Sequence, residues 1–317
     1  MLGRVLLCVG TVLLLFVAYQ LWGTGIAESH SQAVLLKKFD HELEKADAGT
    51  GSQGRSTSGT STTTPDTTPA GSVDPAPTTA DPGDSQPVGL LQIPKIGLDK
   101  VIVEGTSTAD LRQGPGHYLG TPLPGQQGNA AIAGHRTTYG APFYNLNELA
   151  VGDPITVTTT QGVFTYQVTR SLVVPCGDSN CDDPADQAVI AASVTPELTL
   201  TTCNPRFQSS SRLVVQAVLM KASVTPTAAK TTPTTVPVTH RQSAGAAAAD
   251  LAGGQGNWVP ALWWGLGVLA AGVLVWLLAR RRRRGPRVLV YGAGTVGVLL
   301  VLFFFFGAVS PLLPASF

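Results

Sequence analysis

The distribution of low-complexity segments leaves this chain only one stretch that can fold into a globular domain. Residues 23–87 begin with a polar, Leu-punctuated juxtamembrane segment and continue as a linker rich in Thr, Ser and Pro. Residues 222–257 form a second linker of Thr, Pro, Ala and Gly. Segments of such composition cannot bury enough apolar surface to offset the conformational entropy lost on ordering. We therefore expect the folded domain at residues 88–221.

Three other segments are apolar and long enough to span a bilayer. Residues 1–22 carry one such run behind a single arginine, and we interpret them as an uncleaved signal anchor in preference to a signal peptide. Residues 258–279 and 288–313 are the other two, and they flank an Arg-rich loop at 280–287. The positive-inside rule assigns that loop to the cytoplasm. The expected localisation is the cell membrane, with the folded domain on its extracellular side.

The net charge of +1 conceals an uneven distribution of charged residues. Arginines cluster in the predicted cytoplasmic loop, whereas residues 88–221 contain eight Lys and Arg against ten Asp and Glu. A mildly acidic domain lacks the basic surface that nucleic-acid binding requires. We therefore expect no nucleic-acid partner.

Short runs of β-branched and aliphatic residues recur along residues 88–221, and turn residues separate them. Alternating runs at 155–159 and 164–174 flank Gln161-Gly162, which is a hairpin-turn signal. About eight strands at this close spacing predict an all-β fold, a closed or nearly closed barrel with short helices. For the whole chain we therefore predict an eight-stranded β-barrel domain and three transmembrane helices.

One thiol, one imidazole and one guanidinium lie at the ends of predicted strands. Cys203 ends a β-branched run just before Asn204-Pro205, and Arg212 begins the next apolar run. His135 ends a run of small residues further upstream. An antiparallel pairing of the first two strands would bring Cys203 and Arg212 to the same end of the barrel.

These residue types suit nucleophilic catalysis. A thiol reacts as the thiolate, so Cys203 needs a nearby base. His135 titrates near neutrality and can accept and return a proton, and His117 is the alternative base. Arg212 cannot be deprotonated, so it is suited to holding the charge of a developing oxyanion.

Two more cysteines lie close together in a long predicted loop. In an exported domain we expect Cys176 and Cys181 to form a disulfide, with two free thiols or metal binding as the alternatives. Cys203 is then the unpaired and reactive cysteine.

The same loop is acidic, and its carboxylates raise the question of a bound cation. Asp178, Asp182 and Asp183 leave open a calcium site, which we set against a solvated acidic loop because an oxygen cage needs more than charge. We expect no other metal and no organic cofactor.

Several short motifs follow one another in a fixed order along the domain: Gly114-Pro115-Gly116-His117, Pro124-Gly125, Gly128-Asn129, Ala133-Gly134-His135-Arg136, Thr199-Leu200-Thr201-Thr202-Cys203 and Arg212-Leu213. As an ordered set they resemble the sortases, which are cysteine transpeptidases of Gram-positive cell surfaces. Asn204-Pro205 after the cysteine and Tyr118 directly after His117 look most like class E, the type typical of high-GC actinobacteria. The resemblance covers about Gly89 to Lys221, which is the whole expected domain.

This resemblance implies a sortase-like β-barrel in which Cys203 is the nucleophile, His135 the general acid and base, and Arg212 the cation beside the acyl oxygen. It implies cleavage of a Leu-Ala-x-Thr-Gly sorting signal between Thr and Gly through a thioacyl intermediate. The protein would then be transferred to an amine of the cell-wall peptidoglycan. The candidates for substrate contact are Tyr118, Thr202 and His117.

Two features leave alternatives open. Pilin-polymerising sortases commonly carry a C-terminal membrane segment, as residues 258–313 do here, whereas no recognisable lid segment precedes Gly89. We therefore expect the anchoring role, with a pilin-polymerising sortase, a non-catalytic surface-exposed binding domain and a plain cysteine peptidase as alternatives. The expected partners are secreted proteins with sorting signals, a peptidoglycan precursor amine and the membrane.

Overall fold

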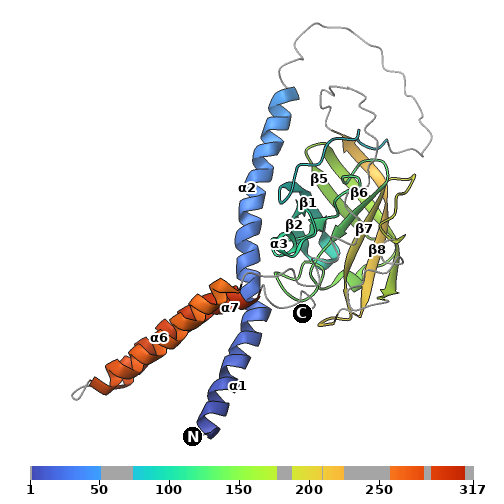
Figure 1. Ribbon diagram of the computed structural model, residues 1–317. Helices are drawn as coiled ribbons and strands as arrows, with labels where there is room; N and C mark the ends of the chain where they lie inside the picture. The colour runs from blue at the N-terminus through green and yellow to red at the C-terminus, as the bar shows by residue number, and fades with distance from the viewer. Residues whose placement is uncertain are drawn as a thin grey trace, which may run out of the picture.

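A computed structural model of the chain describes residues 2–50, 74–176, 188–208, 210–224, 258–281 and 287–310. It contains a β-barrel, a long N-terminal helix that runs along one side of the barrel, and two C-terminal helices that pack on each other (Figure 1). Both the N-terminal end of the long helix and the C-terminal pair point away from the barrel.

The barrel is closed by eight strands in the order β1-β2-β3-β4-β7-β8-β6-β5, which confirms the predicted architecture. Its strands are β1 (Pro87–Ile93), β2 (Leu98–Glu104), β3 (Gly116–His117), β4 (Asn129–Ala133), β5 (Pro154–Thr159), β6 (Gly162–Pro175), β7 (Glu197–Asn204) and β8 (Ser211–Val224). Two of the neighbouring pairs, β2 with β3 and β4 with β7, are parallel, and the others are antiparallel. Short helices connect the strands: η2 (Pro94–Ile96), α3 (Thr108–Leu111) and η3 (Leu146–Glu148).

The barrel interior is filled by side chains that point inward at alternate positions along each strand. Along β5, buried and half-buried residues alternate from Ile155 to Thr159, as the period of two requires. Phe164 and Tyr166 of β6 are fully buried, and the Tyr166 hydroxyl accepts a hydrogen bond from the Gly125 backbone N–H at 2.6 Å. Burial of these aromatic side chains supplies much of the apolar surface that stabilises the domain.

The long N-terminal helix consists of α1 (Leu2–Ala18), a π-helical turn η1 (Tyr19–Gly23) and α2 (Thr24–Thr50). Spacings of three and four residues put Gln32, Leu35 and Phe39 on one face of α2. Leu35 and Phe39 are buried, and Leu35 packs with Val101 of β2. The Gln32 side chain donates to the carbonyls of Val101 (3.0 Å) and Gln113 (2.7 Å) and accepts from the Val101 N–H (2.8 Å).

Residues 74–86, at the C-terminal end of the predicted juxtamembrane segment and linker (23–87), also contact the barrel. Ala76 is buried, and its N–H donates to the Gly125 carbonyl at 2.8 Å. The Gln161 side chain donates to the Pro77 carbonyl at 2.6 Å. α2 and residues 74–86 thus contact the barrel expected at 88–221, through buried apolar side chains as well as backbone and amide hydrogen bonds.

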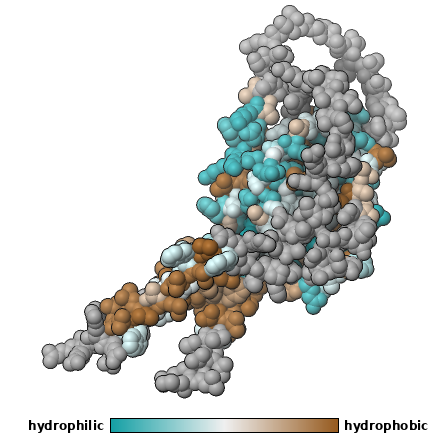
Figure 2. Space-filling view, in the orientation of Figure 1, coloured by the Kyte–Doolittle hydropathy of each residue, from teal (hydrophilic) through white to brown (hydrophobic). Residues whose placement is uncertain are grey.

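The C-terminal helices α6 (Val259–Arg281) and α7 (Arg287–Val309) form an antiparallel pair, with Trp264 stacked on Phe304 at 5.0 Å between ring centroids. Three membrane helices were predicted. Among the described residues, two helical stretches are long and apolar enough to span a membrane, Gly10–Ala46 and Val259–Leu278, and Gly294–Val309 is a shorter apolar helix. Apolar surface concentrates on the helices that leave the barrel (Figure 2).

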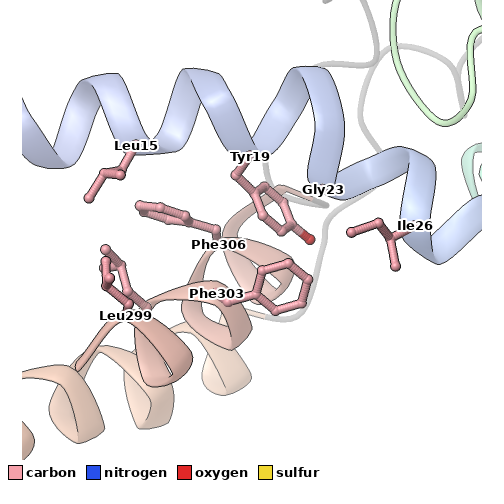
Figure 3. Close-up of a pocket in the computed structure, with 8 residues that line it drawn as sticks. Leu15, Tyr19, Gly23, Ile26, Leu299, Phe303 and Phe306 are labelled. Carbon is pink, nitrogen blue, oxygen red and sulfur yellow. The ribbon is translucent and has the colours of Figure 1, made fainter. Parts of the chain in front are cut away.

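The N-terminal helix and α7 meet beside the π-helical turn. Tyr19 packs edge-on against Phe303, and Phe16 against Phe306, each pair with ring centroids 5.1 Å apart. An apolar cavity of about 290 Å³ opens between the two helices, and its lining includes Leu15, Tyr19, Leu299 and Phe306 (Figure 3). We refer to this contact, with the neighbouring Gln20, Thr24 and Ser310, as the helix junction.

The docking of α2 leads to a stability prediction. Gln32→Ala should lower the free energy of unfolding by about 1–3 kcal/mol, because it leaves buried backbone groups of Val101 without partners. Thermal unfolding of the detergent-solubilised full chain measures the effect, with Lys38→Ala on the exposed face of α2 as the matched control. Equal midpoints for the two variants would show that α2 does not depend on this contact.

Candidate active site

Cys203 and Arg212 face each other across the β7–β8 pair. The antiparallel register aligns Cys203 with Arg212, and Arg212 Nη1 donates to Cys203 Sγ at 2.8 Å. Cys203 is a free thiol and is partly exposed. A permanent cation with a donor N–H therefore lies directly beside the sulfur, as the sequence predicted from the two strand ends.

His135 reaches the same end of the barrel through the parallel pairing of β4 with β7. The register aligns Ala133 with Thr201, and the Gly134 N–H continues the ladder by donating to the Thr201 carbonyl at 3.1 Å. His135 lies two residues beyond Ala133, just as Cys203 lies two residues beyond Thr201. The two strands run in the same direction, so His135 follows β4 at the edge of the barrel where β7 carries Cys203, and the charge of Arg212 acts on its imidazole.

Arg136 fastens these two chain segments together. Its Nη1 donates to the Cys203 carbonyl at 3.1 Å and to Asn204 Oδ1 at 2.6 Å, and its Nη2 donates to Asn147 Oδ1 at 3.0 Å. Thr202 Oγ1 adds a bond to the Gly134 carbonyl at 2.7 Å. Arg136 is a site residue that the sequence analysis missed, although it directly follows His135 in the same motif.

His135 is buried beneath an aromatic side chain. Its ring lies 5.1 Å from the Tyr139 ring, centroid to centroid, and its Nε2 has no hydrogen-bond partner. Burial, and then the positive charges of Arg112 and Arg212, lower the pKa of His135 to about 4. At neutral pH the imidazole is therefore neutral and able to accept a proton.

The three candidates for substrate contact lie in different surroundings. Tyr118 is half-buried, and its hydroxyl shares a hydrogen bond of 3.1 Å with Thr201 Oγ1. Thr202 is buried and donates a hydrogen bond to the Gly134 carbonyl, so it stabilises the backbone next to His135.

His117 is completely buried. Its Nδ1 lies 3.0 Å from Glu104 Oε2, and its Nε2 lies 3.0 Å from the Pro122 carbonyl oxygen. With no exposed atom and partners at both ring nitrogens, His117 is placed as a structural residue of β3 and not at the surface beside Cys203. The sequence could not reveal this, because Glu104 comes from another strand.

The predicted disulfide and calcium loop is only partly described. Cys176 is disulfide-bonded. Its expected partner Cys181, and the carboxylates Asp178, Asp182 and Asp183, lie outside the described residues. In the described part of the chain, no group of three or more His, Cys, Asp or Glu could hold a metal ion.

The lowered pKa of His135 predicts how stability depends on pH. An unfolded histidine titrates near ~6.5, so between there and about 4 the unfolded state binds more protons. The stability associated with neutral His135 is present above the unfolded pKa, and up to about 3 kcal/mol is lost as the pH falls through the folded pKa.

Thermal unfolding midpoints across this pH window test the effect. His135→Gln should flatten the acid-side decline, whereas His41→Gln, an exposed site on α2, should follow the wild type. Parallel curves for wild type and His135→Gln would contradict the assigned burial.

Comparison with known proteins identifies the domain that carries this site. Residues 91–220 match a family model described as Sortase domain. Sortase SrtE1 of Streptomyces coelicolor is 33% identical over 222 residues, which cover 67% of this chain and 54% of SrtE1. Sortase D of Bacillus subtilis is 36% identical over 125 residues, which cover 39% of this chain and 58% of that protein. The chain thus spans a little over half the length of these two curated relatives.

The chain is also similar to solved structures. The structure of sortase E from Streptomyces avermitilis is 36% identical, with coverage of 45% of this chain and 93% of that one and a TM-score of 0.38. The barrel that brings Cys203, His135 and Arg212 together is therefore a sortase domain, and the chain belongs to the sortase family, with class E sortases among its relatives.

Proposed function

We propose that this chain is a membrane-anchored cysteine transpeptidase that cleaves a Leu-Ala-x-Thr-Gly-like sorting signal between Thr and Gly and transfers the protein to a peptidoglycan amine. The observation that carries the proposal is the 2.8 Å contact between Arg212 and the free thiol of Cys203, beside the buried His135. The signal sequence and the acceptor are expected from the resemblance to class E sortases.

In the first half-reaction the peptide acylates the enzyme. His135 takes the proton of Cys203, and the sulfur attacks the carbonyl carbon of the threonine. The carbonyl oxygen becomes an oxyanion, which the Arg212 guanidinium stabilises. Collapse of this intermediate breaks the C–N bond, and His135 returns the proton to the departing glycine amine.

In the second half-reaction an amine, and not water, accepts the acyl group from Cys203. The acceptor nitrogen attacks the thioester carbon while His135 removes its proton, and Cys203 leaves as the thiolate. Dividing one difficult amide exchange into two steps is the advantage of a covalent intermediate. Water at the same position would give a hydrolysed product.

The position of the site relative to the apolar helices supports a sorting signal and a wall precursor as its substrates. The loop after His135 contacts the helix junction, since the Tyr139 N–H donates to Thr24 Oγ1 at 3.1 Å. The proposed active site thus faces the part of the molecule where the apolar helices begin. A protein held by its C-terminal signal and a lipid-linked wall precursor are both confined to that surface of the bilayer.

Mass spectrometry of the peptide products tests the proposed reaction. The full chain in detergent is incubated with a Leu-Ala-x-Thr-Gly peptide and diaminopimelate, and the expected product is Leu-Ala-x-Thr joined to the amine. Cys203→Ala should abolish it while leaving the thermal unfolding midpoint close to that of the wild type.

The other outcomes each favour a different function. Product formed only with a pilin-type lysine peptide would identify a pilin polymerase, and hydrolysis alone would identify a peptidase. A folded protein that leaves the peptide intact would overturn the enzymatic proposal and favour a binding domain.

Two substitutions of Arg212 test the role of its guanidinium, and we expect them to lower activity to different extents. Arg212→Ala should lower kcat/KM by about 10²–10³, the usual effect of removing an oxyanion donor. Arg212→Lys should recover only part of this loss, because lysine keeps the charge but lacks the planar donor geometry. Arg170→Ala, on the exposed part of β6, serves as the control and should retain activity. Full activity of Arg212→Ala would remove Arg212 from the mechanism.

A further inference from the structure

The loop that follows His135 forms a cover over the imidazole. Tyr139 lies against His135 with an interplanar angle of 37°, and the Arg112 guanidinium lies 5.5 Å from the centre of the Tyr139 ring. His135 is only 7% exposed. The Tyr139 ring therefore separates the imidazole from solvent.

Two hydrogen bonds attach this cover to the helix junction. The Tyr139 N–H donates to Thr24 Oγ1 at 3.1 Å, and the Tyr139 hydroxyl lies 2.7 Å from Ser310 Oγ, directly after α7. Ser310 Oγ in turn donates to Gln20 Oε1 at 3.2 Å. Thr24 and Ser310 are both buried, so the bonds are shielded from competing water. The N-terminal helix and the residue directly after α7 thus both bond Tyr139, which lies against His135.

The loop also packs tightly against α2. A Cβ placed on Gly140 would come within 2.5 Å of Glu28 Oε2, so any larger residue would have to displace the Glu28 side chain. Glu28 is itself fixed by Lys100 of β2, at 2.7 Å. The cover is therefore docked on the N-terminal helix through backbone as well as side-chain contacts.

The backbone of the cover is strained. Tyr139, Gly140 and Ala141 have φ values of +50°, +72° and +43°, in the left-handed region. For the two residues that are not glycine, such conformations are unfavourable and persist only where surrounding contacts impose them. Loss of the contacts to the helix junction would let the segment relax away from His135.

We propose that Tyr139 is a positioning residue that acts as a lid over His135, and that the helix junction holds this lid closed. The inference rests on the proposed role of His135 but concerns its control. Closing and opening would then follow the relative position of the N-terminal helix and α7 in the bilayer.

The charges around His135 set the direction of the effect. Arg112 at the end of α3 and Arg212 of β8 are the cations that act on the imidazole, and Arg212 also contacts the thiol of Cys203 of β7. On the α2 side, Glu28 is paired with Lys100. Opening the lid admits water, which screens both guanidiniums and solvates the imidazolium, so the pKa of His135 should rise. His135 then becomes a stronger base toward the Cys203 thiol.

Histidine NMR titration of the full chain in detergent tests the lid without relying on activity. With ¹³C-labelled histidine, the His135 signal is assigned by its loss in His135→Gln. Thr24→Val/Ser310→Ala removes both bonds to the lid and should raise the His135 midpoint by about one pH unit or more. Ser29→Ala/Ser31→Ala, whose hydroxyls bond only carbonyls of their own helix, should leave the midpoint unchanged.

A second variant keeps the test valid if the double substitution impairs folding. Tyr139→Phe keeps the ring and the bond to Thr24 but loses the bond to Ser310, and it should shift the midpoint in the same direction by a smaller amount. Ser310→Ala removes the same hydrogen bond as Tyr139→Phe, together with the bond to Gln20, so combining the two should shift the midpoint no further than Ser310→Ala alone. Unchanged midpoints in folded variants, or additive shifts of these two, would overturn the proposal.

Peptide turnover by the same variants separates this inference from the proposed function. If the midpoint rises in Thr24→Val/Ser310→Ala and Tyr139→Phe but neither these variants nor the wild type makes product, the lid stands and the transpeptidase assignment falls. If the wild type makes product and the midpoints do not move, the assignment stands and the lid falls.

Discussion

The parallel pairing of β4 with β7 is the constraint on which the site depends. It joins two segments far apart in the sequence and makes them end at the same edge of the barrel, with Ala133 opposite Thr201. The bonds that continue beyond the strands, from Gly134, Thr202 and Arg136, extend this alignment. The neighbouring antiparallel pair β7–β8 then adds Arg212 to the same edge. A shift of one residue in either register would turn one of the three functional side chains to the other face of the sheet.

The electrostatics of the site follow from how deeply each group is buried. The thiol is partly exposed and touches a guanidinium, whereas the imidazole is enclosed and faces two cations. Burial and positive charge both favour the neutral imidazole, which leaves His135 free to accept a proton but makes it a weak base, because the imidazolium formed when the thiol gives up its proton is disfavoured. A cover that can open would reduce this cost, and the strained segment from Tyr139 to Ala141 provides one attached to the helices.

Local sequence patterns were sufficient for the barrel and for the strand ends that carry its chemistry. Alternation and turn residues predict the strands, and Cys203 and Arg212 fall on two strands close in sequence, whose pairing is local. Contacts between distant segments were not predictable in this way. Gln32 looks like any polar residue of an exposed helix, yet it bonds the backbone of β2. His117 follows the loop-like motif Gly114-Pro115-Gly116, yet it is buried and paired with Glu104 of another strand. Nothing in the residue type of Tyr139 indicates its left-handed backbone or its contact with Ser310.

The central claim is that Cys203 forms a covalent acyl bond with the peptide beside His135 and Arg212, and trapping that bond tests it most directly. The full-length protein is incubated with a Leu-Ala-x-Thr-Gly peptide without an amine acceptor, quenched in acid, and analysed by intact mass spectrometry and peptide mapping. The account predicts a mass increase equal to the Leu-Ala-x-Thr acyl group, located on Cys203 and absent in Cys203→Ala. An acyl group on a different residue, or no adduct on a folded protein that still cleaves the peptide, would contradict it.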